Sequence, residues 1–133
     1  MLKVHYSMKN TEIDAVEALR GLLEKVPILQ VKGIDTEAAS GDWAPDWIAR
    51  LLVDGQPHQL VCEYKSNAQP RYARSALLEL RNYMAHRAPQ ATPVFIAPYL
   101  SPAVRQLCEE QGVGYLDLEG NARIAFGGVF IER

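Results

Sequence analysis

Two acidic residues and a lysine flank a mostly apolar stretch in the middle of the chain. Asp46 follows a proline, 16 residues separate it from Glu63, and Lys65 lies two positions further on. Carboxylate oxygens suit Mg²⁺, which proteins hold through one or two carboxylates while the cation keeps several waters. An ammonium group beside them could orient a water molecule and stabilise the charge that develops on a phosphate. If the fold brings the three side chains together, the chemistry that they predict is hydrolysis of a phosphodiester bond.

A second interpretation of the same residues involves no catalysis. Glu-x-Lys at the end of a strand is a short pattern, and such residues often form only a surface ion pair that contributes little to stability. The spacing alone leaves this alternative open. Asp42, in the sequence GDWAPD, also competes with Asp46 as the first acidic residue, although Asp46 fits the Pro-Asp pattern and the strand register better.

A predicted β-hairpin has to position the three residues. Residues 47–53 are rich in apolar and β-branched types, residues 54–57 (DGQP) supply turn chemistry, and residues 58–65 form the second strand. A four-residue turn over DGQP would place Val53 opposite His58. The open end of the hairpin then lies near residue 46.

This register predicts which side chains share a face. It pairs Asp46 with Lys65 and Ile48 with Glu63. Because side chains alternate between the two faces of a strand, Asp46, Glu63 and Lys65 are expected on the same face. The opposite face is expected to carry core residues, namely Leu60, Cys62 and Tyr64.

Hydrophobic periodicity and turn residues predict the remaining elements. Helices are expected at residues 11–26, at residues 70–86 and from Pro102 to Gly112, where Ser101 can cap the first turn. The first helix is expected to bury a stripe made of Ile13, Val16, Leu19, Leu23 and Val26. Strands are expected at residues 28–34, 93–97, 113–118 and 122–126, with residues 129–131 as a further candidate. The order α-β-β-β-α-β-α-β-β indicates an α/β fold with a central mixed sheet flanked by helices.

The composition suits a single domain, residues 1–133, of a cytoplasmic protein. The chain has 133 residues, 48% of them hydrophobic, which is enough for one continuous core. No apolar run reaches the ~20 residues that cross a bilayer, so no membrane partner is expected. The N-terminal residues are polar and predict no secretory signal. Cys62 and Cys108 lack the spacing of zinc ligands and are expected to be small buried hydrophobes.

The charge is distributed unevenly along the chain. The net charge is −2, but residues 65–87 contain five basic residues and one acidic residue, so this segment carries +4 and the rest −6. Arg71, Arg74 and Arg81 recur at steps of three and seven and therefore share a helix face, which could meet nucleic-acid phosphates. Gln69 could add a hydrogen bond. A solvated helix face is the alternative, and charge alone does not separate the two interpretations.

The pattern resembles a known superfamily of nucleases. Pro-Asp, 16 residues and then EYK at the end of an apolar strand look like the motif of the PD-(D/E)XK nuclease superfamily, which has the restriction-endonuclease-like fold. The expected order of elements resembles the core of that family over essentially the whole chain. The segment PVFIAPYLSPAVRQLCEEQGVGYLDLEGNARI is similar to the late strand–helix–strand of Mrr-type restriction enzymes and related bacterial nuclease-like domains.

The resemblance implies roles for individual residues. Asp46 and Glu63 would be metal ligands and Lys65 the catalytic lysine, with Mg²⁺ as the cofactor and Mn²⁺ as a substitute. Many members of the superfamily also use an acidic residue from the first helix. Glu17 and Glu24 are the candidates for this additional acid, and a solvated helix face is the alternative.

Two further polar groups lie where the related domains also carry polar residues. Gln69 is the residue most similar to the extra polar residue that follows the lysine in some relatives. Asp117 and Asn121 lie in a turn that the related domains share, and we expect turn chemistry from them rather than catalysis.

Two classes of function remain in competition. The first is a Mg²⁺-dependent endodeoxyribonuclease of a defence or repair system, for which a C2 homodimer would suit cleavage of both strands. The second is a catalytically silent nuclease-like module that binds DNA or regulates, such as an antitoxin-type component. The set of Asp46, Glu63 and Lys65 favours catalysis, because a pure binder has no need of metal ligands. The acidic overall charge favours the module.

Overall fold

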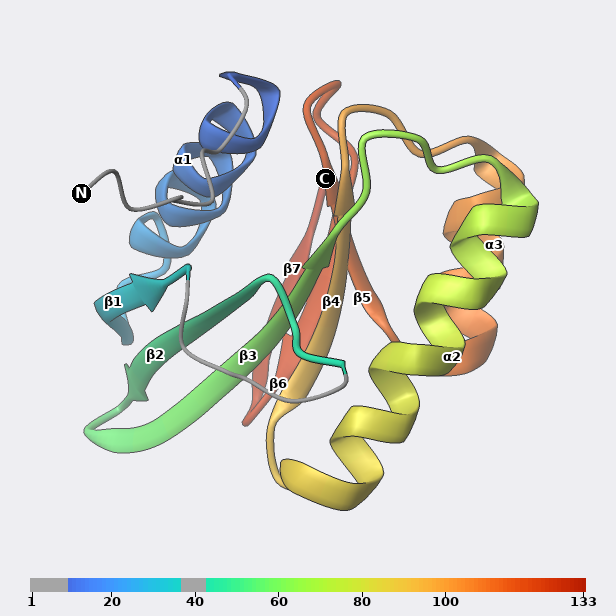
Figure 1. Cartoon of the computed structure of the whole chain (residues 1–133). Helices are drawn as coiled ribbons and strands as arrows, with labels where there is room; N and C mark the ends of the chain where they lie inside the picture. The colour runs from blue at the N-terminus through green and yellow to red at the C-terminus, as the bar shows by residue number, and fades with distance from the viewer. Residues whose placement is uncertain (1–9, 37–42) are drawn as a thin grey trace, which may run out of the picture.

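A curled sheet of seven strands, with helices on both of its faces, makes up the described part of the chain (Figure 1). The computed structural model describes residues 10–36 and 43–133. The strands lie in the sheet in chain order, from β1 at one edge to β7 at the other. Helix α1 (Asn10–Glu24) covers one face of the sheet, whereas α2 (Pro70–Arg87) and α3 (Pro102–Gln111) cover the other.

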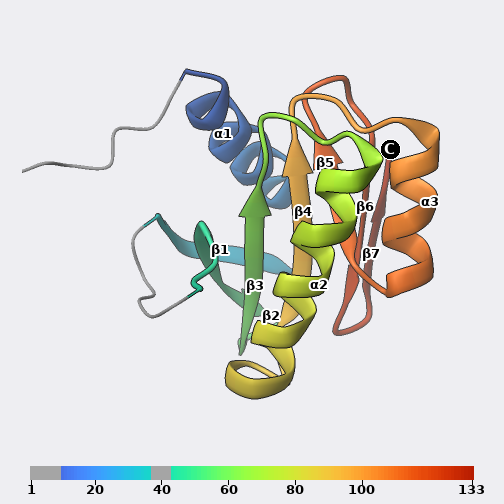
Figure 2. The same cartoon turned by 45° about the vertical axis from the view of Figure 1, so that its right-hand side comes forward.

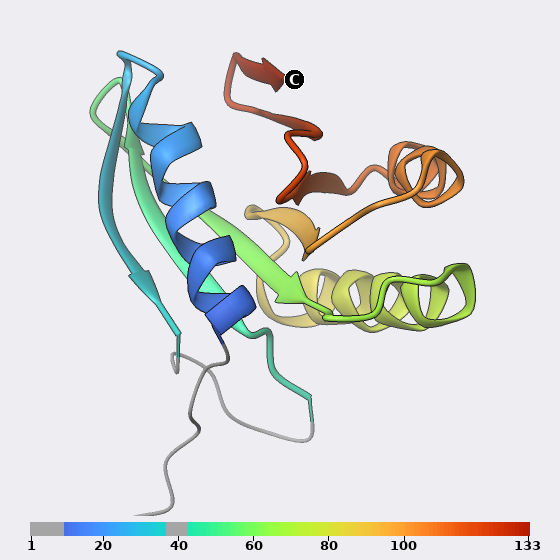
Figure 3. The same cartoon turned by 90° about the horizontal axis from the view of Figure 1, so that it is seen from above.

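The first three strands form an antiparallel meander. β1 (Leu29–Asp35) pairs with β2 (Trp47–Val53), and β2 pairs with β3 (Gln56–Tyr64). The register between β1 and β2 shifts between Val31 and Gly33. Because an irregularity of this kind bends a strand and increases its twist, it helps this end of the sheet to curve around α1 (Figure 3).

The middle strands are parallel, and helices make the connections between them. β3, β4 (Thr92–Ala97) and β5 (Gly114–Asp117) run in the same direction (Figure 2). Parallel neighbours need a long crossover, which α2 supplies between β3 and β4 and α3 supplies between β4 and β5. β6 (Ala122–Phe126) and β7 (Val129–Glu132) return to antiparallel pairing. The sheet is therefore mixed, as the sequence predicts.

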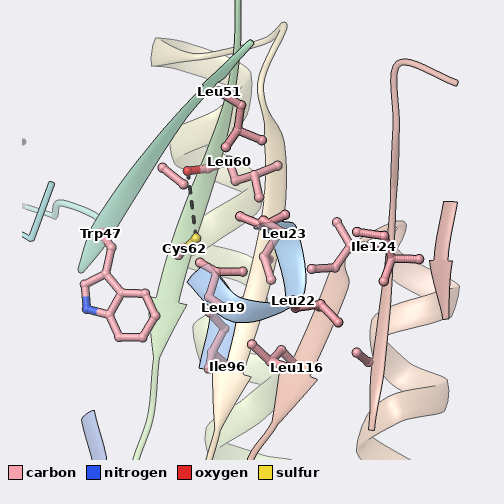
Figure 4. Close-up of a cluster of buried hydrophobic side chains, with 14 of the residues drawn as sticks. Leu19, Leu22, Leu23, Trp47, Leu51, Leu60, Cys62, Ile96, Leu116 and Ile124 are labelled. Carbon is pink, nitrogen blue, oxygen red and sulfur yellow. Dashed lines mark hydrogen bonds between the residues drawn. The ribbon is translucent and has the colours of Figure 1, made fainter. Parts of the chain in front are cut away.

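Two hydrophobic clusters attach the helices to the sheet. On the α1 face, Leu19, Leu22 and Leu23 pack with residues of β2 to β6 (Figure 4). On the other face, side chains of α2 and α3 pack with Val61, Phe95 and their neighbours. β4 and the second half of β3 are thus covered on both faces, which explains the apolar runs LVC in β3 and VFIA in β4. The expected burial of both cysteines, Cys62 and Cys108, is confirmed.

The expected fold class is confirmed: the chain is α/β, with a mixed sheet flanked by helices. The candidate strand near residue 129 forms as β7. α3 begins and ends as predicted, because Ser101 Oγ accepts a hydrogen bond from the N–H of Val104 at 3.3 Å and Gly112 adopts a φ of 71°. Across residues 10–36 and 43–133, no helix is both long enough and apolar enough to cross a membrane.

The expected register of the central hairpin is wrong by two residues. Val53 pairs with Gln56 and not with His58, because Asp54 and Gly55 alone form the turn. Both turn residues have positive φ, 49° and 82°. Positive φ at both positions is typical of a two-residue type I′ turn, for which Asp-Gly is a preferred sequence. A shift of two residues preserves the alternation of side chains, so the expected faces of the hairpin are unaffected.

Candidate active site

Asp46, Glu63 and Lys65 meet where β2 begins and β3 ends. Asp46 directly precedes β2, Glu63 is the second-last residue of β3, and Lys65 directly follows that strand. Trp47 lies opposite Cys62, so Asp46, one step further, lies beside Glu63 and not opposite Lys65 as expected. The Nζ of Lys65 is 3.3 Å from Oε2 of Glu63. The structure therefore brings the three side chains together, in a register that differs from the one expected.

Backbone hydrogen bonds fix both strands at this point. The N–H of Tyr64 donates to Oδ2 of Asp46 at 2.8 Å. The N–H of Lys65 donates to the carbonyl oxygen of Ile96 on β4 at 2.9 Å, which extends the parallel pairing past the end of β3. The sheet itself, and not a loop, thus determines where these residues lie, and sites built on strands are held more rigidly than sites on loops.

Glu63 is a buried carboxyl group with an unsatisfied oxygen. The residue is 3% exposed, its Oε2 contacts Lys65, and its Oε1 has no hydrogen-bond partner among the described residues. Burial, followed by the negative charge of Asp46 and by a side-chain hydrogen bond between the two acids, raises the pKa of Glu63 from 4.5 to about 8. The Lys65 ammonium opposes this shift. It is outweighed, because its side chain is 41% exposed and water weakens its attraction for the carboxylate.

The donor set fits a hard divalent cation. Two adjacent carboxylates repel each other, and burial penalises the charge of Glu63, so a cation shared by Asp46 and Glu63 would offset both effects. The free Oε1 of Glu63 is also available as a ligand atom. Within residues 10–36 and 43–133, no cluster of three or more His, Cys, Asp and Glu side chains could hold a metal ion. Mg²⁺ needs no more than one or two carboxylates. The rival acid Asp42 lies outside the described residues.

The two acids suggested for the first helix lie on its outer surface. Glu17 and Glu24 are both exposed on α1, where solvent surrounds their carboxylates. The residues of α1 that face the sheet recur at helical spacing, and Ile13, which was expected among them, is 45% exposed. A role for Glu17 or Glu24 as an additional acid stays a prediction.

The acidic residue that α1 does bury is Glu12, which the sequence alone did not single out. Glu12 is 4% exposed, and its Oε2 accepts a hydrogen bond of 3.1 Å from the indole N–H of Trp47. It occupies the same helical stripe as Ala15, Val16 and Leu19. Ala15, Val16 and Leu19 follow Glu12 by three, four and seven positions, which is the spacing of one helix face. This spacing is the signal in the sequence that indicates burial of Glu12.

The residues suggested to contact nucleic acid are all exposed: Gln69, Arg71, Arg74 and Arg81. Arg71 stacks over the ring of Tyr72 at 4.6 Å and donates a hydrogen bond of 2.8 Å to its hydroxyl oxygen. Arg81 differs from the other two arginines, because it donates a hydrogen bond to Oε1 of Gln111 on α3. The basic face therefore exists, with Arg81 linked to the neighbouring helix.

Two hollows adjoin the loop that joins β3 to α2. One, of about 260 Å³, lies between Lys65 and α2 and is also lined by Tyr72 and Ser75. The other, of about 540 Å³, is lined by Gln69 and Tyr99 among other residues, and residues 66 and 67 border both hollows. Lys65 thus lines the first hollow and Gln69, at the start of α2, lines the second.

Asp117 and Asn121 provide turn chemistry, as expected. Asp117 is 2% exposed and accepts hydrogen bonds from the backbone N–H groups of Leu100, Glu119 and Asn121, at 2.9 to 3.0 Å. The side-chain amide of Asn121 donates a further bond to it at 2.9 Å. These four bonds account for the burial of this carboxylate without any catalytic role.

Neither a scan against protein families nor a search of curated proteins gives a match for this sequence. Among solved structures, EndoMS in complex with double-stranded DNA matches 88% of the chain at 17% identity, with a TM-score of 0.48. EndoMS in its apo form matches 86% at 16% identity, with a TM-score of 0.43. The chain spans about half of either match, 48% and 47% of their lengths. A likeness with such low TM-scores carries no weight for function, which has to be inferred from this chain's own residues.

Proposed function

We propose that this chain is a Mg²⁺-dependent nuclease domain that hydrolyses phosphodiester bonds in DNA. One observation carries the proposal: Asp46 and Glu63 lie side by side next to Lys65, and a buried oxygen of Glu63 has no partner. An isolated buried carboxylate is unfavourable unless a cation or a hydrogen-bond donor accompanies it.

Each of the three side chains has a distinct task in this proposal. Asp46 and Glu63 hold the divalent cation. A bound Mg²⁺ or Mn²⁺ supplies a water of lowered pKa and neutralises negative charge on the phosphate. Lys65, with its ammonium group partly exposed at the end of β3, orients the attacking water and donates hydrogen bonds to the phosphate oxygens as negative charge builds on them.

The basic face of α2 supplies the substrate contacts. Arg71 and Arg74 follow Lys65 by one short loop, and guanidinium groups bind phosphate oxygens through two parallel hydrogen bonds. Gln69 adds a polar contact at the start of the helix. Arg81 lies further along the same face, where its bond to Gln111 holds it toward α3. We assign DNA as the substrate on the strength of this positively charged segment, residues 65–87, in a chain that is otherwise acidic.

The test of this function is cleavage of supercoiled plasmid DNA with Mg²⁺ or Mn²⁺. The wild-type protein is expected to nick the plasmid, while Asp46→Ala and Lys65→Ala should not. Glu110→Ala, at an exposed position of α3, is the matched control and should cleave like the wild type. Nicking that persists in both site variants would indicate a contaminating nuclease and would remove the enzymatic interpretation.

The second candidate function is a DNA-binding or regulatory module without catalysis. The contact between Lys65 and Glu63 favours it, because an inert ion pair at a strand end would have the same geometry. Such a module would bind DNA in a salt-sensitive manner and leave the plasmid intact with either metal.

A further inference from the structure

The first turn of α1 contacts the residue that follows each of the two acids. Trp47 follows Asp46, and its indole N–H donates to Oε2 of Glu12 at 3.1 Å. Tyr64 follows Glu63, and its hydroxyl donates to Oγ1 of Thr11 at 3.0 Å. Two consecutive residues of one helix thereby hold the start of β2 and the end of β3, on the two sides of the acidic pair.

The two aromatic residues also hold each other. The rings of Trp47 and Tyr64 stack with centroids 5.9 Å apart and an angle of 20° between their planes. The backbone N–H of Tyr64 in turn donates to Asp46 at 2.8 Å. We use the name "α1 clamp" for the four residues Thr11, Glu12, Trp47 and Tyr64, which form a closed set of contacts around the start of β2 and the end of β3.

Burial makes the bond from Trp47 to Glu12 the strongest part of the clamp. Glu12 and Trp47 are 4% and 1% exposed, so little water competes for their hydrogen bond. A cation held by only two carboxylates requires that both be placed to within about 0.5 Å.

We propose that the α1 clamp positions Asp46 against Glu63 for cation binding, and that Glu12 is a positioning residue that acts through Trp47. This inference rests on the proposed function, because it concerns the same pair of acids. It differs from the prediction that an acidic residue of the first helix is itself a ligand. In the clamp, one carboxylate oxygen of Glu12 accepts the indole N–H, a task that an amide oxygen can also perform.

Substitutions of Glu12 separate positioning from ligation. Glu12→Gln keeps an oxygen that can accept the indole N–H, whereas Glu12→Ala has no acceptor. The readouts are the Mn²⁺ dissociation constant of the free protein, measured by calorimetry, and the Mn²⁺ concentration for half-maximal plasmid cleavage. Because Glu12→Ala removes one hydrogen bond, and Glu12 acts on Asp46 only through Trp47, it should raise both values by up to about 10-fold. Glu12→Gln should stay within about threefold of the wild type, since it keeps a hydrogen-bond acceptor for the indole N–H.

Trp47→Phe tests the other end of the same bond. It keeps an aromatic ring next to Tyr64 but removes the N–H donor, so it should match Glu12→Ala. The double variant Glu12→Ala/Trp47→Phe should bind Mn²⁺ no more weakly than either single variant, because each single substitution already removes the same hydrogen bond. Leu51→Val, a smaller change in the same strand and the same core, is the control for loss of packing, and its Mn²⁺ affinity should equal that of the wild type.

Thr11→Ala provides a measurement at an exposed position, where the fold is not at risk. It removes the acceptor for Tyr64 and is expected to weaken Mn²⁺ binding less than Glu12→Ala, with an unchanged circular dichroism spectrum. If Glu12→Gln loses as much affinity as Glu12→Ala, Glu12 acts by its charge and the positioning role is wrong. Equal affinity in Glu12→Ala, Thr11→Ala and the wild type would also overturn it. A wild-type protein that neither binds Mn²⁺ nor cleaves DNA would instead overturn the proposed function itself.

Discussion

The backbone N–H of Tyr64 donates a hydrogen bond of 2.8 Å to Oδ2 of Asp46. The last residue pair of β2 and β3 at this end of the hairpin is Trp47 with Cys62, and this bond continues the contact between the two strands beyond that pair. The acceptor is a side-chain carboxylate and not a backbone carbonyl. As a result, Asp46 lies next to Glu63, and its negative charge contributes to the raised pKa of that residue. The geometry of the candidate site thus follows from an extension of the sheet.

Asp46→Asn is expected to abolish cleavage while keeping the hydrogen bond. An asparagine oxygen still accepts from Tyr64, so the fold should be retained, but the variant has lost one of the two charges for the cation. Because the cation contributes several kcal/mol to transition-state stabilisation, we expect the rate to fall at least about 100-fold. Plasmid cleavage at a fixed Mg²⁺ concentration measures it, and a rate near that of the wild type would exclude Asp46 as a ligand.

The stability of the metal-free protein should fall as the pH rises from about 5 to about 8. The folded-state pKa of Glu63 is raised from 4.5 to about 8, so folding favours the protonated acid. Its contribution to stability is fully present below the unfolded pKa of 4.5 and is lost as the pH rises through the folded pKa. The slope can reach about 1.4 kcal/mol per pH unit. Urea unfolding in the presence of EDTA measures it, and Glu63→Gln should flatten the profile in this window.

Mg²⁺ should reverse this loss of stability at pH 8. A ligand that binds only the folded protein stabilises it by about 2.7 kcal/mol at 100 times its dissociation constant. We therefore expect Mg²⁺ to raise the melting temperature at pH 8 and to have a smaller effect at pH 5, where Glu63 is protonated. Thermal unfolding of the wild type and of Glu63→Gln measures the effect. If Mg²⁺ raised the melting temperatures of the wild type and of Glu63→Gln equally, the cation would bind at another site.

Arg71 and Arg74 should contribute to DNA affinity more than Arg81 does. Each phosphate contact that is removed should weaken binding and reduce the slope of log affinity against log salt by about 1. Arg71→Ala and Arg74→Ala are expected to show both effects. Arg81→Ala should show less of each, because Gln111 already engages its guanidinium group. Fluorescence anisotropy with duplex DNA over a series of salt concentrations measures the slopes, and identical values for all three variants would contradict this ranking.

In the hairpin of β2 and β3, the sequence predicts the bounds of β2 and the faces of both strands correctly, but it predicts the wrong register. The bounds of β2, Trp47–Val53, were predicted correctly from the apolar run before an Asp-Gly pair. Gln56 and Pro57 continue the polar stretch and therefore predict a turn of four residues, but both belong to β3. The faces were nevertheless predicted correctly, because side-chain alternation has a period of two and the error was also two. The partner of Asp46 depends on the register itself, and that prediction was wrong.

The spacing of Glu12 fits the buried stripe of α1, but apolar residue types alone do not include it in that stripe. A stripe predicted from apolar residues alone begins at Ile13 and leaves out Glu12. The buried carboxylate of Glu12 accepts a hydrogen bond from an indole N–H that lies 35 residues away in the sequence, on another element. A buried carboxylate is acceptable only when such a donor exists, and that donor becomes visible only once α1 and β2 are placed together. The basic face of α2, by contrast, is local and was predicted from spacing alone.

The most direct measurement of the central claim is a crystal of the wild-type protein soaked in Mn²⁺, with anomalous diffraction data. The account predicts a peak between Asp46 and Glu63, about 2.0–2.2 Å from an oxygen of each, as for a hard divalent cation in octahedral geometry. The same soak of Glu63→Gln should lack this peak. Absence of a peak in the wild type at Mn²⁺ concentrations that support cleavage, or a peak bound by neither acid, would contradict the claim that these two residues share the cation.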